Sequence, residues 1–238
     1  MRKAIIIGAS SGIGFALAKL LSENDYKVGI TGRGISELEK LKETKPDRFL
    51  ISAFDIRDTD LLPHKINDLI NNLGGLDLFV YCAGTGNLND GLDFRIEKET
   101  IDTNIIGFTC SSNIAFNFFE KQQFGHLVVI SSVAGIRGNR QAPAYNASKA
   151  FQINYIEGLR QKACKLKHPI HITDIRPGFV DTAMAKGDGL FWVASVEKAS
   201  KQIFNAIKAK KKVAYVTKRW RMIGFVLKLI PKFIYDKL

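Results

Sequence analysis

Three residues between positions 131 and 149 have the types and the spacing that acid–base chemistry needs. Tyr145 and Lys149 are four residues apart, and Ser132 lies thirteen residues before the tyrosine. In a helix, residues i and i+4 share a face, so the phenol and the ammonium group would point the same way. A phenol loses its proton near pH ~10, and a nearby cation favours the phenolate and lowers that pKa. We therefore expect Tyr145 to act as a general acid or base near neutral pH.

A glycine-rich turn near the start of the chain could hold the phosphates of a cofactor. The apolar run of residues 4–7 predicts a buried parallel strand, and residues 15–23 predict a helix. Between them, Gly8 would permit a tight turn, Gly12 would let backbone approach a pyrophosphate, and Gly14 would let helix and strand pack closely. The start of the helix offers free N–H groups and a partial positive charge to the anion.

The end of the next apolar run, residues 27–31, bears on the choice of cofactor. A site for NAD places an acidic residue about 20 residues past the glycine-rich turn, on the ribose 2′-hydroxyl. Gly32 and Arg33 stand there instead, and a guanidinium matches a 2′-phosphate by charge and by its forked shape. We predict that NADP(H) is preferred, with NAD(H) as the alternative; a solvated loop arginine is the plainer interpretation of Arg33.

Apolar runs alternate with helical segments along most of the chain. The predicted strands are residues 4–7, 27–31, 48–53, 76–81, 125–130, 169–175 and 213–216, and the later predicted helices are residues 58–73, 97–121, 144–167 and 196–208. This order predicts an α/β, Rossmann-type doubly wound parallel sheet of about seven strands, with helices on both faces. Such sheets bind ligands beyond the carboxyl ends of their strands, so residues just past those ends should meet in one crevice.

Taken together, these motifs resemble those of the short-chain dehydrogenase/reductase family, in its single-domain branch, over residues 3–217. The matching positions are Gly8-x-x-x-Gly12-x-Gly14, Asp55, Ala83-Gly84, Asn104, Ser132, Tyr145-x-x-x-Lys149 and Pro177-Gly178. Each has a plain structural explanation when it stands alone, such as a turn, a cap or an exposed helix face. Their joint occurrence at the family's spacing favours the enzyme.

The resemblance implies a role for each matching residue. Tyr145 would exchange a proton with the carbonyl or hydroxyl oxygen that Ser132 holds, and Lys149 would bind the nicotinamide ribose and lower the tyrosine pKa. Asn104 would hold a relay water through a locally irregular helix. Asp55 would reach the adenine. The expected cofactor-binding residues are Gly8, Ser10, Ser11, Gly12, Ile13, Gly14, Arg33, Asp55, Ala83, Gly84, Tyr145, Lys149, Pro177, Gly178, Val180 and Thr182.

The chain departs from the family at two linked positions. Ile7 stands where a threonine is usual, and Cys82 stands where an asparagine is usual. In the family these two side chains help to join neighbouring strand ends by hydrogen bonding. Because replacing both partners of a hydrogen bond with apolar groups can be nearly neutral, we expect catalysis to survive the pair of changes.

The segment of residues 183–195 should choose the substrate. It carries Met184, Leu190, Phe191 and Trp192, which favour an apolar carbonyl or alcohol but are equally consistent with side chains that pack the loop down. Gly187 and Gly189 are candidate hinges of a lid.

Residues 218–238 form a basic, amphipathic tail after the predicted domain of residues 1–217. From position 208 onward there are ten Lys or Arg and one acid, Asp236, so most of the net charge of +12 lies there. The apolar run of residues 222–227 is broken by Lys228 and is too short to span a bilayer. Packing or contact in a homodimer or homotetramer is favoured over peripheral contact with an anionic membrane. No specific nucleic-acid partner is predicted, because a basic tail alone gives nonspecific attraction.

The three cysteines form no CxxC pair and no metal-like cluster with the four histidines, which predicts a reducing, cytoplasmic compartment and no metal site. We expect no signal peptide, because the apolar run of residues 4–7 is too short. The prediction is an NADP(H)-dependent oxidoreductase that interconverts a carbonyl and an alcohol. The alternatives are a catalytically silent NADP-binding sensor or scaffold, and a membrane-peripheral reductase of lipophilic substrates. The complete group of Asn104, Ser132, Tyr145 and Lys149 disfavours the silent protein.

Overall fold

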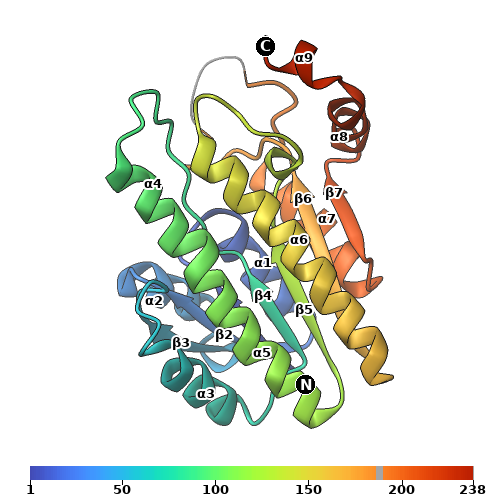
Figure 1. The fold of residues 1–238 in the computed structure, drawn as a ribbon. Helices are drawn as coiled ribbons and strands as arrows, with labels where there is room; N and C mark the ends of the chain where they lie inside the picture. Colours follow the sequence, from blue (N-terminus) through green and yellow to red (C-terminus); the bar gives the residue numbers. More distant parts are fainter. Residues whose placement is uncertain (186–189, 238) are drawn as a thin grey trace.

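The computed structural model describes residues 1–185 and 190–237 and contains one parallel sheet (Figure 1). Its strands run in the order β3-β2-β1-β4-β5-β6-β7, and all neighbours are parallel. They are β1 (Arg2–Ile7), β2 (Tyr26–Gly32), β3 (Phe49–Ala53), β4 (Leu78–Tyr81), β5 (Gly125–Ile130), β6 (Ile170–Pro177) and β7 (Val213–Val216). The order reverses between β1 and β4, which confirms the doubly wound prediction. This switch point opens a crevice at the carboxyl ends of the strands.

Helices cover both faces of the sheet (Figure 1). One core contains side chains of α1 (Gly12–Glu23), α2 (Ile35–Thr44) and α7 (Val196–Lys208). The other contains side chains of α3 (Leu62–Leu73), α5 (Phe108–Gln122) and α6 (Pro143–Leu166). Successive residues of β1 alternate between them: Ala4 and Ile6 enter the first core, and Ile5 and Ile7 enter the second. Because side chains of a strand alternate in direction, an all-apolar strand is buried on both faces.

Two helical segments differ from the sequence prediction. The single helix expected over residues 97–121 is α4 (Phe94–Ile101), a π-helical turn (Asp102–Gly107) and then α5. Helix α2 was not predicted, because it buries only Leu38 and Leu41 and its apolar stripe is correspondingly weak. Short 3₁₀ turns occur at Pro46–Arg48 and Val133–Ile136.

The basic tail folds into α8 (Trp220–Leu229) and α9 (Lys232–Tyr235), at the opposite end of the molecule from the N-terminus (Figure 1). Helix α8 packs against β7 and the 3₁₀ turn Val133–Ile136, with Gly224 buried at the contact. Arg137 fixes this arrangement: its side chain donates hydrogen bonds to the carbonyls of Leu227 and Ile230 at the end of α8. Among the described residues, no helix is long and apolar enough to cross a membrane.

Candidate active site

A cavity of about 970 Å³ lies at the carboxyl ends of the strands. It is lined by segments that follow β1, β2, β3, β4, β5 and β6, as expected for a ligand site at the switch point of such a sheet. Every residue predicted to bind the cofactor lines it, and Ser132 lines it too. Asn104 is the exception among the predicted site residues, because it is fully buried behind the wall.

The glycine-rich turn has the backbone geometry that an anion site needs. Gly8 and Gly12 have φ of +90° and +52°, a conformation that side chains disfavour. A Cβ atom on Gly8 would also lie 2.6 Å from the backbone nitrogen of Ala83. Helix α1 begins at Gly12, and its N-cap residue, Ser11, makes no capping hydrogen bond; the first turn contains no acidic residue. The first N–H groups of α1 are thus left without a capping side chain for a phosphate.

The far end of the cavity carries a cation, Arg33, and an acid, Asp55, that is paired with Arg57. Arg33 is exposed directly after β2, where its charge faces the cavity rim. Asp55 is held by Arg57, with Arg57 Nη2 2.6 Å from Asp55 Oδ2. The hydrogen bond from Arg57 is the main cause that lowers the pKa of the Asp55 carboxyl, and Arg33 contributes a smaller attraction. These residues line the end of the cavity where the adenosine of a nicotinamide cofactor is predicted to lie.

The catalytic candidates come together at the inner end of the cavity. Tyr145 and Lys149 lie on one face of α6, and Lys149 Nζ is 5.8 Å from the centroid of the tyrosine ring. The phenol is within hydrogen-bonding reach of Ser132, a contact that favours the phenolate. Loss of surrounding water outweighs it, however, and raises the pKa of Tyr145. The prediction that Lys149 lowers this pKa stays a prediction, because burial and the contact with Ser132 are the causes that set the direction of the shift in this structure.

Lys149 is buried, and the pKa of its ammonium group is lowered. Burial lowers the pKa of its ammonium group to about 8, although the negative charge of Asp174 acts in the opposite direction. Nζ donates hydrogen bonds to the Ile130 carbonyl and to Gln152 Oε1, both at 3.1 Å. The lysine is therefore held in place before any cofactor is bound.

Asn104 lies in the π-helical turn, which confirms the irregular helix expected there. Its side chain makes three hydrogen bonds: Nδ2 donates to the Thr85 carbonyl and to Ser148 Oγ, and Oδ1 accepts from the Thr85 N–H. Its backbone carbonyl accepts a hydrogen bond from Gln152 Nε2 at 2.9 Å. A carbonyl oxygen has two lone pairs, so the role of Asn104 in holding a relay water stays a prediction.

Gln152 is a site residue that sequence reasoning missed. It is fully buried, and its one amide joins the Asn104 carbonyl to Lys149 Nζ. The sequence offers only a glutamine seven residues after Tyr145 in a predicted helix, and it does not show which elements pack against that position.

A model of the short chain dehydrogenase family matches residues 2–189. The chain belongs to the short-chain dehydrogenase family. An uncharacterized oxidoreductase of Staphylococcus haemolyticus is 34% identical over 188 residues, covering 78% of this chain and 80% of that protein. An uncharacterized oxidoreductase of Mycobacterium tuberculosis is 30% identical over 192 residues, covering 77% and 75%.

Solved structures share the fold of this short-chain dehydrogenase. ElxO with NADP bound has a TM-score of 0.78 at 22% identity, covering 90% of this chain and 96% of that chain. Levodione reductase has a TM-score of 0.80 at 20% identity, covering 90% and 95%. The family match and the oxidoreductase relatives make this chain a NAD(P)-dependent oxidoreductase that acts on a small molecule.

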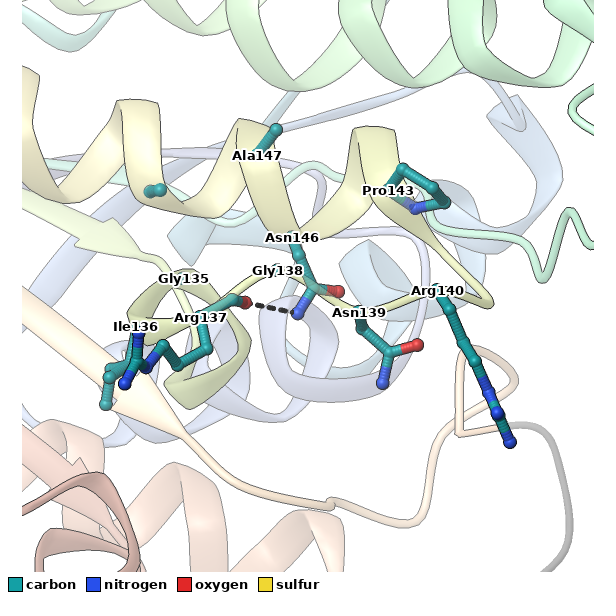
Figure 2. A pocket seen from close by; sticks show the side chains of 10 residues that line it. Gly135, Ile136, Arg137, Gly138, Asn139, Arg140, Pro143, Asn146 and Ala147 are labelled. Atoms are coloured by element: carbon teal, nitrogen blue, oxygen red, sulfur yellow. Dashed lines mark hydrogen bonds between the residues drawn. The ribbon is translucent and has the colours of Figure 1, made fainter. Parts of the chain in front are cut away.

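The loop between Ser132 and Tyr145 of this short-chain dehydrogenase is fastened by Asn146. Its Nδ2 donates to the carbonyls of Ala134 and Arg137 at 2.9 and 2.8 Å, and the second of these bonds is drawn in Figure 2. The same loop borders a smaller hollow of about 450 Å³ against α6, and Arg140 is among the residues that line it (Figure 2). Asn146 therefore fixes the loop that joins Ser132 to Tyr145. This role was also missed from the sequence.

The nicotinamide end predicted for Pro177, Gly178, Val180 and Thr182 is closed by an aromatic cluster. Trp220 is buried in this cluster, and a side chain on Gly178 would overlap its indole ring. Phe191 stacks on Trp220 with ring centroids 5.2 Å apart, and Phe179 meets the same ring edge-on at 5.2 Å.

The apolar side chains of residues 183–195 divide between the cavity wall and packing outside it, and the apolar nature of the substrate stays a prediction. Met184, Leu190 and Phe191 line the cavity, whereas Trp192 packs on Trp220 and Arg219 outside it. Trp220 itself lines the cavity although it follows the predicted domain. Gly187 and Gly189, the candidate hinges, lie outside the described residues.

The two departures from the family pattern lie side by side at the ends of β1 and β4. The Cys82 N–H donates to the Ile7 carbonyl at 2.9 Å, so backbone joins these strand ends without the usual side chains. Burial raises the pKa of the Cys82 thiol to about 12, which keeps it neutral beside Lys149. Neither Ile7 nor Cys82 therefore adds an unpaired charge to the site.

Proposed function

We propose that this enzyme interconverts a carbonyl and an alcohol by hydride transfer with NADP(H), and that Tyr145 is its general acid or base. The observation that supports this most directly is the placement of Tyr145. Its phenol faces the cavity beside Ser132, with Lys149 on the same helical face and an uncapped helix N-terminus across the crevice. When bound, the nicotinamide supplies or accepts the hydride, and the protein provides position and charge.

Each catalytic side chain has a defined task in carbonyl reduction. The Ser132 hydroxyl donates a hydrogen bond to the carbonyl oxygen, and Tyr145 transfers its proton to that oxygen. Lys149 then lies close to the phenolate that remains, and its positive charge stabilises it. Burial raises the pKa of Tyr145, so the phenol is protonated at neutral pH and can act as the acid in carbonyl reduction.

Arg33 supports NADP(H) over NAD(H). Its guanidinium stands directly after β2 at the cavity rim, where the 2′-phosphate of the adenosine ribose would lie. The acid at this end, Asp55, is engaged by Arg57 and would repel a phosphate less than a free carboxylate. The NADP-bound ElxO neighbour is consistent with this choice.

An apolar substrate fits the lining on the nicotinamide side. Side chains from the substrate segment and from α8 form this part of the wall: Met184, Leu190, Phe191, Trp220, Ile223 and Leu227. We propose a hydrophobic ketone, aldehyde or alcohol as the substrate, acted on in the cytoplasm by a homodimer or homotetramer. The three cysteines are free thiols, in keeping with a reducing compartment.

The test is a panel of carbonyls and alcohols assayed with both NADPH and NADH, in the wild type and in Tyr145→Phe. We expect turnover with NADPH that falls by at least a thousandfold in Tyr145→Phe, with nucleotide binding retained in calorimetry. Full turnover by Tyr145→Phe would refute the assigned role. Nucleotide binding without turnover of any panel member would favour the silent sensor instead.

A further inference from the structure

The outward face of α8 is apolar, although it is exposed. Met222, Phe225, Val226 and Leu229 are spaced i, i+3, i+4 and i+7, so they form one stripe along the helix. Their exposed fractions are 72%, 64%, 52% and 64%. Phe233 of α9 is also exposed, at 70%. We define these five residues as the outer stripe.

The opposite face of α8 accounts for the packing of the tail, so the outer stripe is not needed for it. Trp220 and Gly224 are buried against the domain, and Ile223 and Leu227 are half-buried where they line the cavity. Helix α8 is thus apolar on two sides, one that closes the cavity and one that faces solvent. A helix with two apolar sides is expected to have a second partner.

The segment that carries the outer stripe is strongly basic. Residues 218–237 contain six Lys or Arg and one acid, Asp236, a net side-chain charge of +5. The cations are Lys218, Arg219, Arg221, Lys228, Lys232 and Lys237, and all of them are exposed. None forms an ion pair within the described part of the chain.

We infer that the outer stripe docks on an anionic lipid surface, with its apolar side chains in the interfacial layer and its cations among the headgroups. A short helix with exposed Phe, Leu and Met flanked by Lys and Arg has the composition of an interfacial helix. A second copy of the chain fits less well where a two-fold axis passes through the patch, because that arrangement would set +5 against +5. Nucleic acid would use the cations but leave the apolar side chains in water.

The location of the stripe connects the lipid surface to the cavity. Helix α8 is about 10 Å across, and it carries the outer stripe on one side and the cavity-lining Ile223 and Leu227 on the other. A lipophilic carbonyl compound dissolved in the membrane would therefore lie about one helix diameter from the cavity. This delivery role rests on the proposed function, whereas the docking itself does not.

Vesicle co-sedimentation of the whole protein tests the docking. With vesicles of phosphatidylcholine plus phosphatidylglycerol we expect binding that weakens as salt rises, and with phosphatidylcholine alone we expect little. Phe225→Ser combined with Phe233→Ser should lower the affinity at least tenfold. Phe94→Ser is the matched control, because Phe94 is a phenylalanine with 72% exposure on α4 and should leave binding unchanged.

Variants that remove positive charges test the docking independently of the apolar side chains. Arg221→Gln combined with Lys228→Gln should weaken binding by about fivefold per charge removed, whereas Lys40→Gln with Lys201→Gln should not. The inference is overturned if the wild type does not bind anionic vesicles, or if Phe94→Ser weakens binding as much as the stripe variant. It is also overturned if light scattering shows that the stripe variant halves the molecular mass, since a second copy would then cover the face.

The result of the vesicle-binding test does not depend on whether the proposed catalytic function is correct. Vesicle binding requires neither nicotinamide nor Tyr145, so Tyr145→Phe should bind vesicles like the wild type. Turnover of a water-soluble carbonyl by the Phe225→Ser and Phe233→Ser variant should equal that of the wild type, because neither residue lines the cavity.

Discussion

Gln152 Oε1 accepts a hydrogen bond from Lys149 Nζ at 3.1 Å, and the same amide donates to the Asn104 carbonyl at 2.9 Å. One buried side chain thus connects the cation that would bind the nicotinamide ribose with the irregular turn behind the site. An amide in this position does two things for Lys149: it fixes the direction of the side chain, and it solvates the positive charge. We regard Gln152 as a positioning residue of the catalytic group.

Removing that amide should make Lys149 easier to deprotonate. A hydrogen bond to a charged group contributes about 1.5–3 kcal/mol, and one pKa unit corresponds to about 1.4 kcal/mol. We expect kcat/KM of the wild type for reduction to fall as the pH rises through about 8, where Lys149 loses its proton. In Gln152→Leu this fall should occur about one to two pH units lower.

Gln152→Glu is the control for the pH profile, because a carboxylate beside Lys149 favours the cation and should move the fall to higher pH. A merely structural role for Gln152 would lower the rate at every pH and leave the position of the fall unchanged. That result would contradict the assignment.

The perturbed pKa of Lys149 also predicts a pH dependence of stability. The pKa is about 8 in the folded protein and near 10.5 in the unfolded chain, so the unfolded state binds more protons between these values. The contribution of Lys149 to the free energy of unfolding should therefore rise from pH 8 to pH 10.5. Denaturant unfolding of the wild type and Lys149→Met measures it. The difference in free energy between the two proteins should change across this window and be constant below pH 7.

Arg33→Ala tests the cofactor preference. Loss of a charge-assisted contact with the 2′-phosphate, at about 1.5–3 kcal/mol, should raise the KM for NADPH by about 10- to 150-fold. The KM for NADH should change little, because NADH has no 2′-phosphate. Arg95→Ala, at an exposed arginine of α4, is the control. Equal losses with both cofactors would show that Arg33 does not read the phosphate.

Gly178→Ala tests the contact between the nicotinamide end and Trp220. The added methyl group would overlap the indole ring, so the substitution should lower the free energy of unfolding by about 1–3 kcal/mol. Gly158→Ala is the matched control, since a Cβ atom there meets no atom within 4 Å and Gly158 lies inside α6. It should stabilise the protein by about 0.5–1 kcal/mol. Equal effects of the two substitutions in thermal or urea unfolding would contradict the close packing.

The cavity lining was predictable from sequence because each motif follows directly after a strand. Parallel strands end at one edge of their sheet, so Gly8, Arg33, Gly84, Ser132 and Gly178 meet there. The contribution of Trp220 could not be predicted in this way. It lies 42 residues after Gly178 in sequence, and the pairing of β6 with β7, with Pro177 opposite Val216, brings the two together.

Properties that depend on the removal of water from a side chain could not be predicted from the sequence either. The spacing of Tyr145 and Lys149 correctly placed them on one helical face, but spacing carries no information on how much water surrounds the phenol. Its pKa is raised for that reason. Gln152 was missed on similar grounds, because the sequence does not show that the π-helical turn packs on α6 and accepts a hydrogen bond from this side chain.

Arg137 connects the loop that follows Ser132 to the C-terminal helices. It follows the 3₁₀ turn after Ser132, and it holds the last carbonyls of α8 while its guanidinium stacks on Tyr235 at 4.9 Å from the ring centroid. Cutting off residues 218–237 would therefore remove part of the cavity wall and release the loop that carries Ser132. A shortened protein would lose activity with or without a membrane. Recombinant versions of this enzyme are best extended at the N-terminus, where Met1 is exposed at the other end of the molecule.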